Sequence, residues 1–352
     1  MSDPHRDLSE PYALAEFAIA TSEFGDKQHA SDAISKLIKL ATPEDGAMYW
    51  VLEHNTPFYG WGHAGRVEST AMAVLALATV DPTDETRHLV DAGTLWLLQQ
   101  KDRYGVWYSG QATVDVLSAL LKGIDTNASR NPDARLAAAV NGKTVPLDGG
   151  WSPTSDAPAI IDISDLIRPG DNTIVVQNGN TLSTASTQAV AEYYIPWTGT
   201  AVTEATRPGD SDALRLAVRF DKTEARAGEE VRCSIEAERI GSRGWGMMIA
   251  EIGLPPGADV DRRVLDDVVS NSGWTVSHYD ILPDRLVLYL WPNAGGTKLT
   301  FKFRPRYGLK ARTAPSVLYD YYNPEALVAL PPADFNVKAI PHSEPVKTVA
   351  EK

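Results

Sequence analysis

Residues 68–78 read Glu-Ser-Thr-Ala-Met-Ala-Val-Leu-Ala-Leu-Ala, and their apolar side chains recur three and four positions apart. This spacing predicts a helix with one buried face. Two more segments share the pattern: residues 12–20, Tyr-Ala-Leu-Ala-Glu-Phe-Ala-Ile-Ala, and residues 111–121, Gln-Ala-Thr-Val-Asp-Val-Leu-Ser-Ala-Leu-Leu. Residues 1–124 are therefore predicted to be a repeated helical region.

A second helix is expected after each of the first two segments, over residues 30–41 and 84–99. Pro82 ends the preceding helix, and Asp84 is the predicted N-cap of the next. Helical hairpins that recur every 40 to 55 residues or so are typical of arrays in which each unit covers only its neighbours. We therefore expect a partial α/α toroid whose end faces lack partners.

The pattern changes near residue 133, where short β-prone runs replace the helical spacing. The runs are residues 135–140, 159–163 and 172–177, and the first and last precede the dipeptides Asn141-Gly142 and Asn178-Gly179. Asn-Gly between such runs predicts tight β-hairpins. Residues 133–198 are thus expected to form a β half-domain, followed by a linker at 199–211 that has few large apolar residues.

The C-terminal region, residues 212–338, alternates between polar and apolar side chains in several runs separated by turn signals. This predicts a β-sandwich. The candidate strands are residues 214–220, 231–238, 246–252, 285–290, 298–304 and 314–322. Residues 261–269 instead have helical spacing, so one helix should lie on the sandwich, and residues 339–352 are expected to be a tail.

Composition excludes some classes of function. The chain has 352 residues, enough for two or three domains, with 33 basic against 46 acidic residues and a formal net charge of −13. Most of that surface would repel a nucleic-acid backbone. The longest apolar run, residues 71–80, is about half as long as a bilayer-spanning helix requires, and no signal peptide is visible after Met1.

No residue pattern predicts a catalytic, cofactor or metal site. The single cysteine, Cys233, lies in an alternating strand, which indicates a structural thiol and leaves no cysteine-based zinc site. His54 and His63 match no standard ligand spacing, Asp266-Asp267 lacks a third carboxylate, and Ser109 is outside a nucleophile elbow.

Two loops are dense in aromatic and glycine residues: Phe58-Tyr-Gly-Trp-Gly-His and Tyr104-Gly-Val-Trp-Tyr-Ser-Gly. They could line a pocket for a carbohydrate or a terpenoid. The favoured interpretation is that they turn the chain between hairpins and fill the toroid with aromatic side chains.

Three segments of the helical region carry a family resemblance: Arg66-Val-Glu-Ser-Thr-Ala-Met-Ala-Val-Leu-Ala-Leu, Trp96-Leu-Leu-Gln-Gln, and Gly105-Val-Trp-Tyr-Ser-Gly-Gln-Ala-Thr. Together they resemble the closing part of the thioester-containing domain of the alpha-2-macroglobulin and complement family, with Gly110 where threonine is typical. Residues 133–198 resemble the second half of its CUB-like domain. Residues 212–338 resemble its receptor-binding macroglobulin domain, above all in Val317-Leu-Tyr-Asp-Tyr-Tyr-Asn-Pro-Glu.

The resemblance implies the C-terminal portion of a peptidase-trapping protein that changes conformation when a peptidase cuts its bait region. Its partners would be peptidases and the N-terminal part of such a protein, and its location extracellular or periplasmic. The Cys-Gly-Glu-Gln thioester motif is absent from the sequence, as is a bait region, so a non-enzymatic role without its own thioester is expected. The lack of disulfides suggests a bacterial-type member.

The resemblance also implies a partner-binding helix in the last domain. Vertebrate members use two lysines there to engage an endocytic receptor, whereas this sequence has Arg262 and Arg263 beside Asp261, Asp266 and Asp267. Arginine has a planar fork in place of a compact ammonium, and the carboxylates weaken the positive field, which argues against the same receptor.

Two alternatives remain open. The first is an α/α-toroid enzyme of cyclase or lyase type, which requires Glu53, Glu68 and Asp115 to converge. The second is a surface adhesion module in which the sandwich binds a protein partner through its helix, and an exposed apolar patch beside Val264 and Val268 would favour it.

Overall fold

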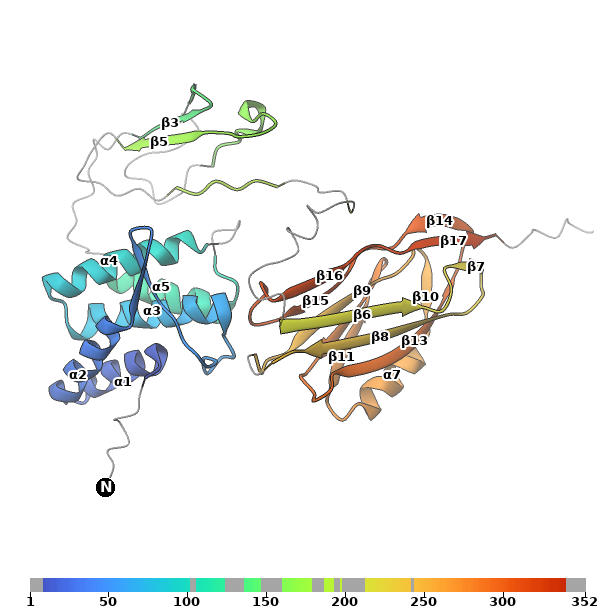
Figure 1. Cartoon of the computed structure of the whole chain (residues 1–352), viewed down its shortest axis with the longest axis horizontal. Helices are drawn as coiled ribbons and strands as arrows, with labels where there is room; N and C mark the ends of the chain where they lie inside the picture. The colour runs from blue at the N-terminus through green and yellow to red at the C-terminus, as the bar shows by residue number, and fades with distance from the viewer. Residues whose placement is uncertain are drawn as a thin grey trace, which may run out of the picture.

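The computed structural model describes residues 9–101, 106–123, 136–146, 160–178, 187–192, 197, 213–241 and 244–339. Helices dominate the N-terminal part and strands the remainder, as the sequence predicts (Figure 1). The predicted linker at 199–211 and the tail beyond residue 339 lie outside the described residues.

The helical part is organised around one central helix, α3. Its helices are α1 (Pro11–Glu23), α2 (Lys27–Lys39), α3 (Gly62–Val80), α4 (Asp84–Gln99) and α5 (Gly110–Gly123). Helix α3 packs against α1, α4 and α5, and its alanine-rich face is fully buried. Small side chains allow this close approach, and at Gly93 of α4 a Cβ atom would lie 2.5 Å from Cγ2 of Val74.

Side chains cap the N-termini of α2 and α4. The carboxylate of Asp26 accepts a hydrogen bond from the amide of His29 at the start of α2 (3.2 Å). The N-cap of α4 is Thr83, and the predicted N-cap Asp84 is the first helical residue. The prediction was wrong by one position because Thr83 and Thr86 form a reciprocal capping box, in which each hydroxyl accepts from the other's amide.

A short hairpin between α2 and α3 was not predicted. Strands β1 (Ala41–Glu44) and β2 (Ala47–Trp50) pair across a turn in which Asp45 and Gly46 have φ angles of 47° and 82°. These angles fit the type I′ hairpin turn, so the Asp-Gly dipeptide was the signal. Trp50 anchors the hairpin because its buried indole donates a hydrogen bond to the carbonyl of Leu37 (2.7 Å).

Helix α5 has one apolar face without cover, as expected for the end of a small array. Val114, Leu117 and Leu121, three and four positions apart, are 58%, 48% and 74% exposed. The opposite face of α5 is buried through Ala112, Val116 and Ala119, which lie in the helical core.

The middle region contains a three-stranded sheet of order β4-β3-β5, with β3 (Leu136–Val140), β4 (Lys143–Val145) and β5 (Ile174–Asn178). The predicted Asn141-Gly142 hairpin is confirmed. The strand predicted at 159–163 is wrong for its described residues, which form no strand and precede the short 3₁₀ helix η1 (Ser164–Leu166). The carboxylate of Asp162 accepts hydrogen bonds from the amide (2.9 Å) and hydroxyl (2.6 Å) of Ser164, a local turn that competes with strand pairing.

The C-terminal part is a β-sandwich. One sheet has the order β10-β13-β8-β6 and the other β11-β12-β9-β15-β16, with a smaller sheet β14-β17-β7 at one end. The strands are β6 (Leu214–Phe220), β7 (Glu224–Arg226), β8 (Val231–Arg239), β9 (Met248–Gly253), β10 (Ala258–Val260), β11 (Val276–Ile281), β12 (Arg285–Leu290), β13 (Thr297–Pro305), β14 (Leu309–Arg312), β15 (Ser316–Asp320), β16 (Leu327–Leu330) and β17 (Asp334–Lys338).

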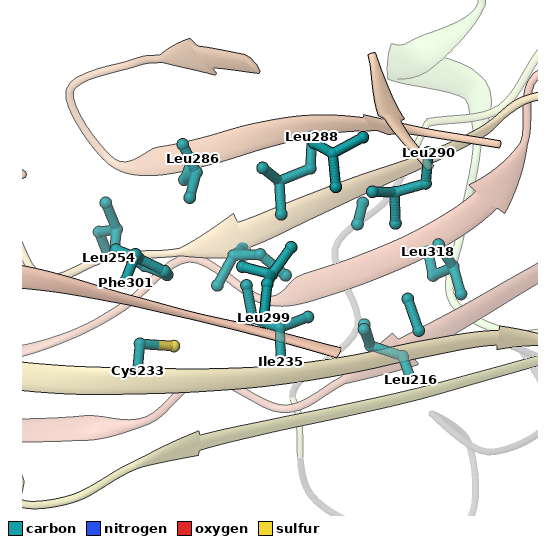
Figure 2. Packing of buried hydrophobic residues seen from close by; sticks show 14 of the residues in the cluster. Leu216, Cys233, Ile235, Leu254, Leu286, Leu288, Leu290, Leu299, Phe301 and Leu318 are labelled. Carbon is teal, nitrogen blue, oxygen red and sulfur yellow. The ribbon is translucent and has the colours of Figure 1, made fainter. Parts of the chain in front are cut away.

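The sandwich core lies between the two main sheets. Ile235 and Phe301 from one sheet meet Leu288 and Leu318 from the other, all at most 1% exposed (Figure 2). The predicted helix is α7 (Arg262–Asn271), which inserts Leu265 into this core.

Candidate functional site

The loop between β2 and α3 joins the helical part to the sandwich, and we call residues 56–61 the docking loop. The loop is closed by two hydrogen bonds between Thr56 and Gly60: the amide of Thr56 donates to the carbonyl of Gly60 (2.8 Å), and the amide of Gly60 donates to the hydroxyl of Thr56 (2.9 Å). Tyr59 has a φ of 66°. Two aromatic residues of this loop, Tyr59 and Trp61, contact the sandwich.

Trp61 leaves the helical part and enters the sandwich core. Its side chain is 3% exposed and belongs to the same buried cluster as the strands of the sandwich. Gly244 makes room for it, because a Cβ atom there would lie 2.9 Å from Cε2 of Trp61. The aromatic loops were expected to fill the toroid, and this is wrong for Trp61 but correct for Trp107, which is buried in the helical core.

Arg239 lies under the Trp61 ring, with its Cζ atom 5.8 Å from the ring centroid. Its guanidinium forms an ion pair with Asp320, and the two side chains are 6% and 0% exposed. Asp320 also accepts hydrogen bonds from the amides of Tyr322 (2.7 Å) and Asn323 (2.8 Å). The buried carboxylate therefore balances the charge that Trp61 covers.

Further aromatic rings surround this contact. Tyr59 lies 5.2 Å from Tyr322 and 6.4 Å from Trp291, measured between ring centroids. His63 approaches Glu325 with 3.9 Å between Nδ1 and Oε1. The helical part thus contacts the sandwich through an aromatic segment that the sequence pattern predicts to lie within the toroid.

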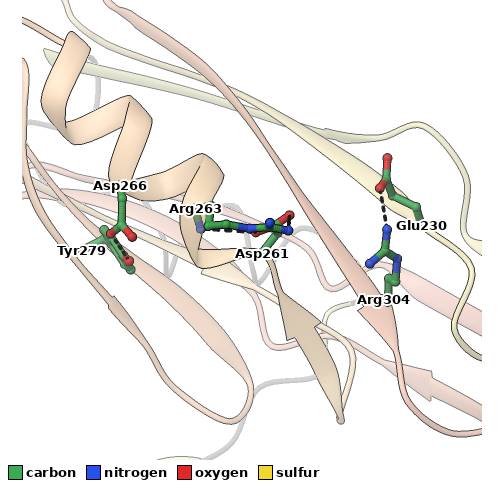
Figure 3. Close-up of polar contacts among 6 residues, drawn as sticks. All are labelled: Glu230, Asp261, Arg263, Asp266, Tyr279 and Arg304. Carbon is green, nitrogen blue, oxygen red and sulfur yellow. Dashed lines mark hydrogen bonds and ion pairs between the residues drawn. The ribbon is translucent and has the colours of Figure 1, made fainter.

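The predicted partner-binding residues Arg262 and Arg263 lie in the first turn of α7. Asp261 caps this helix by accepting from the amide of Arg263 (3.2 Å), and the Arg263 side chain contacts the same carboxylate (Figure 3). The hydrogen bond from Arg263 holds the pKa of Asp261 below its usual value.

A pocket of about 350 Å³ lies beside these two arginines. Its lining includes Lys302 and Arg304 of β13, which both form ion pairs with Glu230, at 2.8 Å and 3.1 Å. Four cationic side chains therefore converge on the pocket: Arg262, Arg263, Lys302 and Arg304.

Val264 and Val268 do not form the exposed apolar patch that would favour the adhesion alternative. Val268 packs against the sandwich core, and neither Val264 nor Val268 is exposed. The carboxylate of Asp266 accepts a hydrogen bond from the hydroxyl of Tyr279 (2.7 Å), which ties the helix to β11.

The carboxylates required by the enzyme alternative converge only in part. Glu68 and Asp115 are 1% and 8% exposed and interact electrostatically, whereas Glu53 is exposed and donates its amide to Glu10 (3.2 Å). The hydroxyl of Tyr108 donates to Oε1 of Glu68. Burial raises the pKa of Glu68, and it raises the pKa of Asp115 to about 6.

The other chemically active side chains have structural partners. Cys233 is fully buried in β8, and burial raises the pKa of its thiol to about 12. His54 pairs with Glu10 (2.8 Å), and the Ser109 hydroxyl accepts from the amide of Ala112 at the start of α5 (3.1 Å). No group of three or more possible metal ligands occurs among the described residues.

Residues 1–122 match the family model of the A-macroglobulin TED domain, and residues 244–328 match that of the A-macroglobulin receptor binding domain. The chain carries two domains of the A-macroglobulin family. The two matches span more than half of its length and follow the order that the sequence motifs indicate.

Solved bacterial alpha-2-macroglobulins have a similar fold. A crystal structure of native alpha-2-macroglobulin from Escherichia coli, spanning domain MG7 to the C-terminus, aligns with a TM-score of 0.51 and 11% identity, over 95% of this chain and 50% of that one. A mutant of Salmonella alpha-2-macroglobulin aligns with a TM-score of 0.52 and 13% identity, over 94% and 20%. The chain therefore spans half or less of the length of these relatives. Among its described residues, no helix is long and apolar enough to cross a bilayer.

Proposed function

We propose that this A-macroglobulin chain is the C-terminal, non-catalytic portion of a protein that traps peptidases by changing conformation. The observation that carries the proposal is the presence of a TED match followed by a receptor-binding match in one chain. The buried Trp61 contact supports it, because it couples two parts that a conformational change could separate.

Within this proposal, the chain contributes no thioester of its own. Its single cysteine, Cys233, is buried in the sandwich with a pKa raised to about 12, so the thiolate that acyl chemistry needs is disfavoured. Covalent capture would have to come from residues outside this sequence.

We propose the following domain limits: residues 1–124 as the end of the TED, 133–198 as the CUB-like segment and 212–338 as the receptor-binding sandwich. The support is the change from helices to strands after α5 and the separate sandwich core. We also propose an extracellular or periplasmic location, which rests on the resemblance to the A-macroglobulin family.

We also propose that the turn of α7 with Arg262 and Arg263 contacts a protein partner with acidic side chains. Support comes from the four cationic side chains around the adjoining pocket. Three carboxylates line the same pocket and offset part of its positive charge. Because salt screens exposed charges, the contact with the acidic partner should weaken as salt is added.

The experiment uses the full-length natural protein that carries this chain, incubated with trypsin. Trapping predicts that trypsin loses activity on casein but continues to cleave a small peptide amide. If the protein leaves the activity of trypsin on casein and on the small peptide amide unchanged, the proposal is rejected. A Cys233→Ala variant should trap trypsin as well as the wild type does, because the thiol is buried.

A further inference from the structure

The carboxyl group of Glu68 lies directly beneath the docking loop. Glu68 is in the second turn of α3, and a Cβ atom on Gly60 would lie 2.5 Å from its Oε2 atom. The carboxyl therefore packs against the loop backbone just before Trp61, the residue that enters the sandwich core. The Glu68 carboxyl is therefore in contact with the segment that links the helical part to the sandwich.

A second buried carboxyl lies close to Glu68. Asp115 of α5 accepts a hydrogen bond from Gln111 through Oδ1 (2.9 Å). Its Oδ2 atom, like Oε2 of Glu68, is buried and has no hydrogen-bond partner among the described residues. A buried, incompletely bonded carboxylate is costly when charged, and two neighbouring charges repel each other.

The surroundings supply more acidic groups. Helix α1 contributes Tyr12 and Glu16, and Tyr108 precedes α5. The cation on α3, Arg66, lies over the ring of Tyr49 in β2 (5.8 Å from Cζ to the ring centroid). The charged side chains of α2 and α4 that the structure describes are exposed. Hydrogen bonds from Thr56 to Glu68 and from Gln111 to Asp115 favour the ionised carboxylates, but burial has the larger effect on both pKa values. The ionisable groups identified as acting on the pair are acidic or phenolic.

We propose that Glu68 and Asp115 form a pH-sensitive support for the docking loop, in which protonated carboxyls hold the loop against the sandwich and ionisation loosens it. The protonated forms suit the buried site and can donate a hydrogen bond. The ionised forms place two neighbouring like charges in this buried site, with that of Glu68 against Gly60, and outward movement of the loop would let water reach them.

The direction of the pH effect follows from the raised pKa values. Burial raises the pKa of Asp115 from an ordinary 3.8 to about 6 and moves that of Glu68 in the same direction. The docked state therefore holds protons that the open state releases. The docked loop is most stable below the ordinary carboxyl pKa and becomes less stable as the pH rises toward 6. Above about pH 6, the Asp115 contribution to this stability changes little.

The test is hydrogen exchange of the docking-loop amides in the full chain between pH 4.5 and 7.5, corrected for the intrinsic rate. We expect the fraction of open loop to rise about 30-fold over this range, because the Asp115 pKa of about 6 lies about 1.5 pH units above 4.5 and each unit is a factor of ten. The double variant Glu68→Gln, Asp115→Asn should lose this dependence, because amides keep the shape and do not titrate. Glu23→Gln, exposed at the end of α1, should behave as the wild type does.

Two results would overturn the proposal: a wild-type loop whose corrected exchange does not change with pH, or a double variant with the wild-type pH dependence. If the double variant fails to fold, the wild type alone still tests the proposal. Its docking-loop amides must exchange faster as the pH rises, after correction, while the amides of the sandwich core strands must not. Tyr108→Phe provides a further variant. It removes the hydrogen bond to Glu68 and should shift the pH midpoint upward.

Discussion

The ring of Trp61, from the helical part, covers the guanidinium of Arg239 in the sandwich, with 5.8 Å between Cζ and the ring centroid. The same guanidinium is paired with the buried carboxylate of Asp320. Folding of the docking loop and packing of the sandwich are therefore coupled through this contact.

Trp61→Ala should lower the free energy of unfolding by about 3–5 kcal/mol, because it removes a large aromatic side chain from a packed core. Combined with Arg239→Met in a double-mutant cycle, it should give a coupling energy of about 1 kcal/mol. Urea unfolding followed by circular dichroism measures both. Trp274→Ala is the matched control, since Trp274 is 85% exposed and should change stability little.

Asp320→Asn should destabilise the chain by about 3–5 kcal/mol, because it leaves the buried Arg239 charge without its counter-ion. The exposed pair of Arg215 and Glu238 offers the comparison. Glu238→Gln should cost less than about 1 kcal/mol. Equal losses for the two variants in thermal unfolding would contradict a buried ion pair beneath Trp61.

Residues 212–338 should fold when expressed alone, because their core lies between their own two sheets. They should be less stable than in the full chain, since Trp61 is missing from that core. Residues 1–198 should be only marginally folded, with the α5 face and Trp61 both uncovered. Calorimetry of each fragment tests this, and a cooperative, monomeric transition for residues 1–198 would count against it.

The double variant Leu117→Lys, Leu121→Lys should raise the solubility of the chain without lowering its stability. Both side chains are exposed on α5, so lysine places its charge in water and breaks an apolar face. Light scattering at increasing concentration measures association. Val116→Lys on the buried face is the contrasting variant and should unfold the helical part.

Much of the fold could be predicted from local pattern. Strong periodicity identified α3, α5 and β8, and the Asn141-Gly142 dipeptide identified a hairpin. The strand expected at 159–163 failed because Asp162 bonds locally to Ser164, a contact that the alternation of apolar residues does not reveal. Short or edge strands such as β7 and β10, three residues each, have too few side chains to show a period.

The site was harder to predict because its contacts join distant parts of the sequence. Nothing near Trp61 indicates that its ring leaves the toroid, since the partners Arg239 and Asp320 lie far along the chain. One signal was present: Glu68 is an acidic residue on a helix face that is otherwise apolar and buried. Charged residues are seldom buried without a partner, so an acidic residue at such a position indicates a candidate site.

The most direct test of the conformational account is hydrogen exchange in the full-length natural protein before and after trypsin is added. If the helical part and the sandwich separate during trapping, exchange should become faster in residues 56–61 and 244–248 together, because Trp61 must leave Arg239. Trapped trypsin with unchanged exchange in both segments would contradict the account.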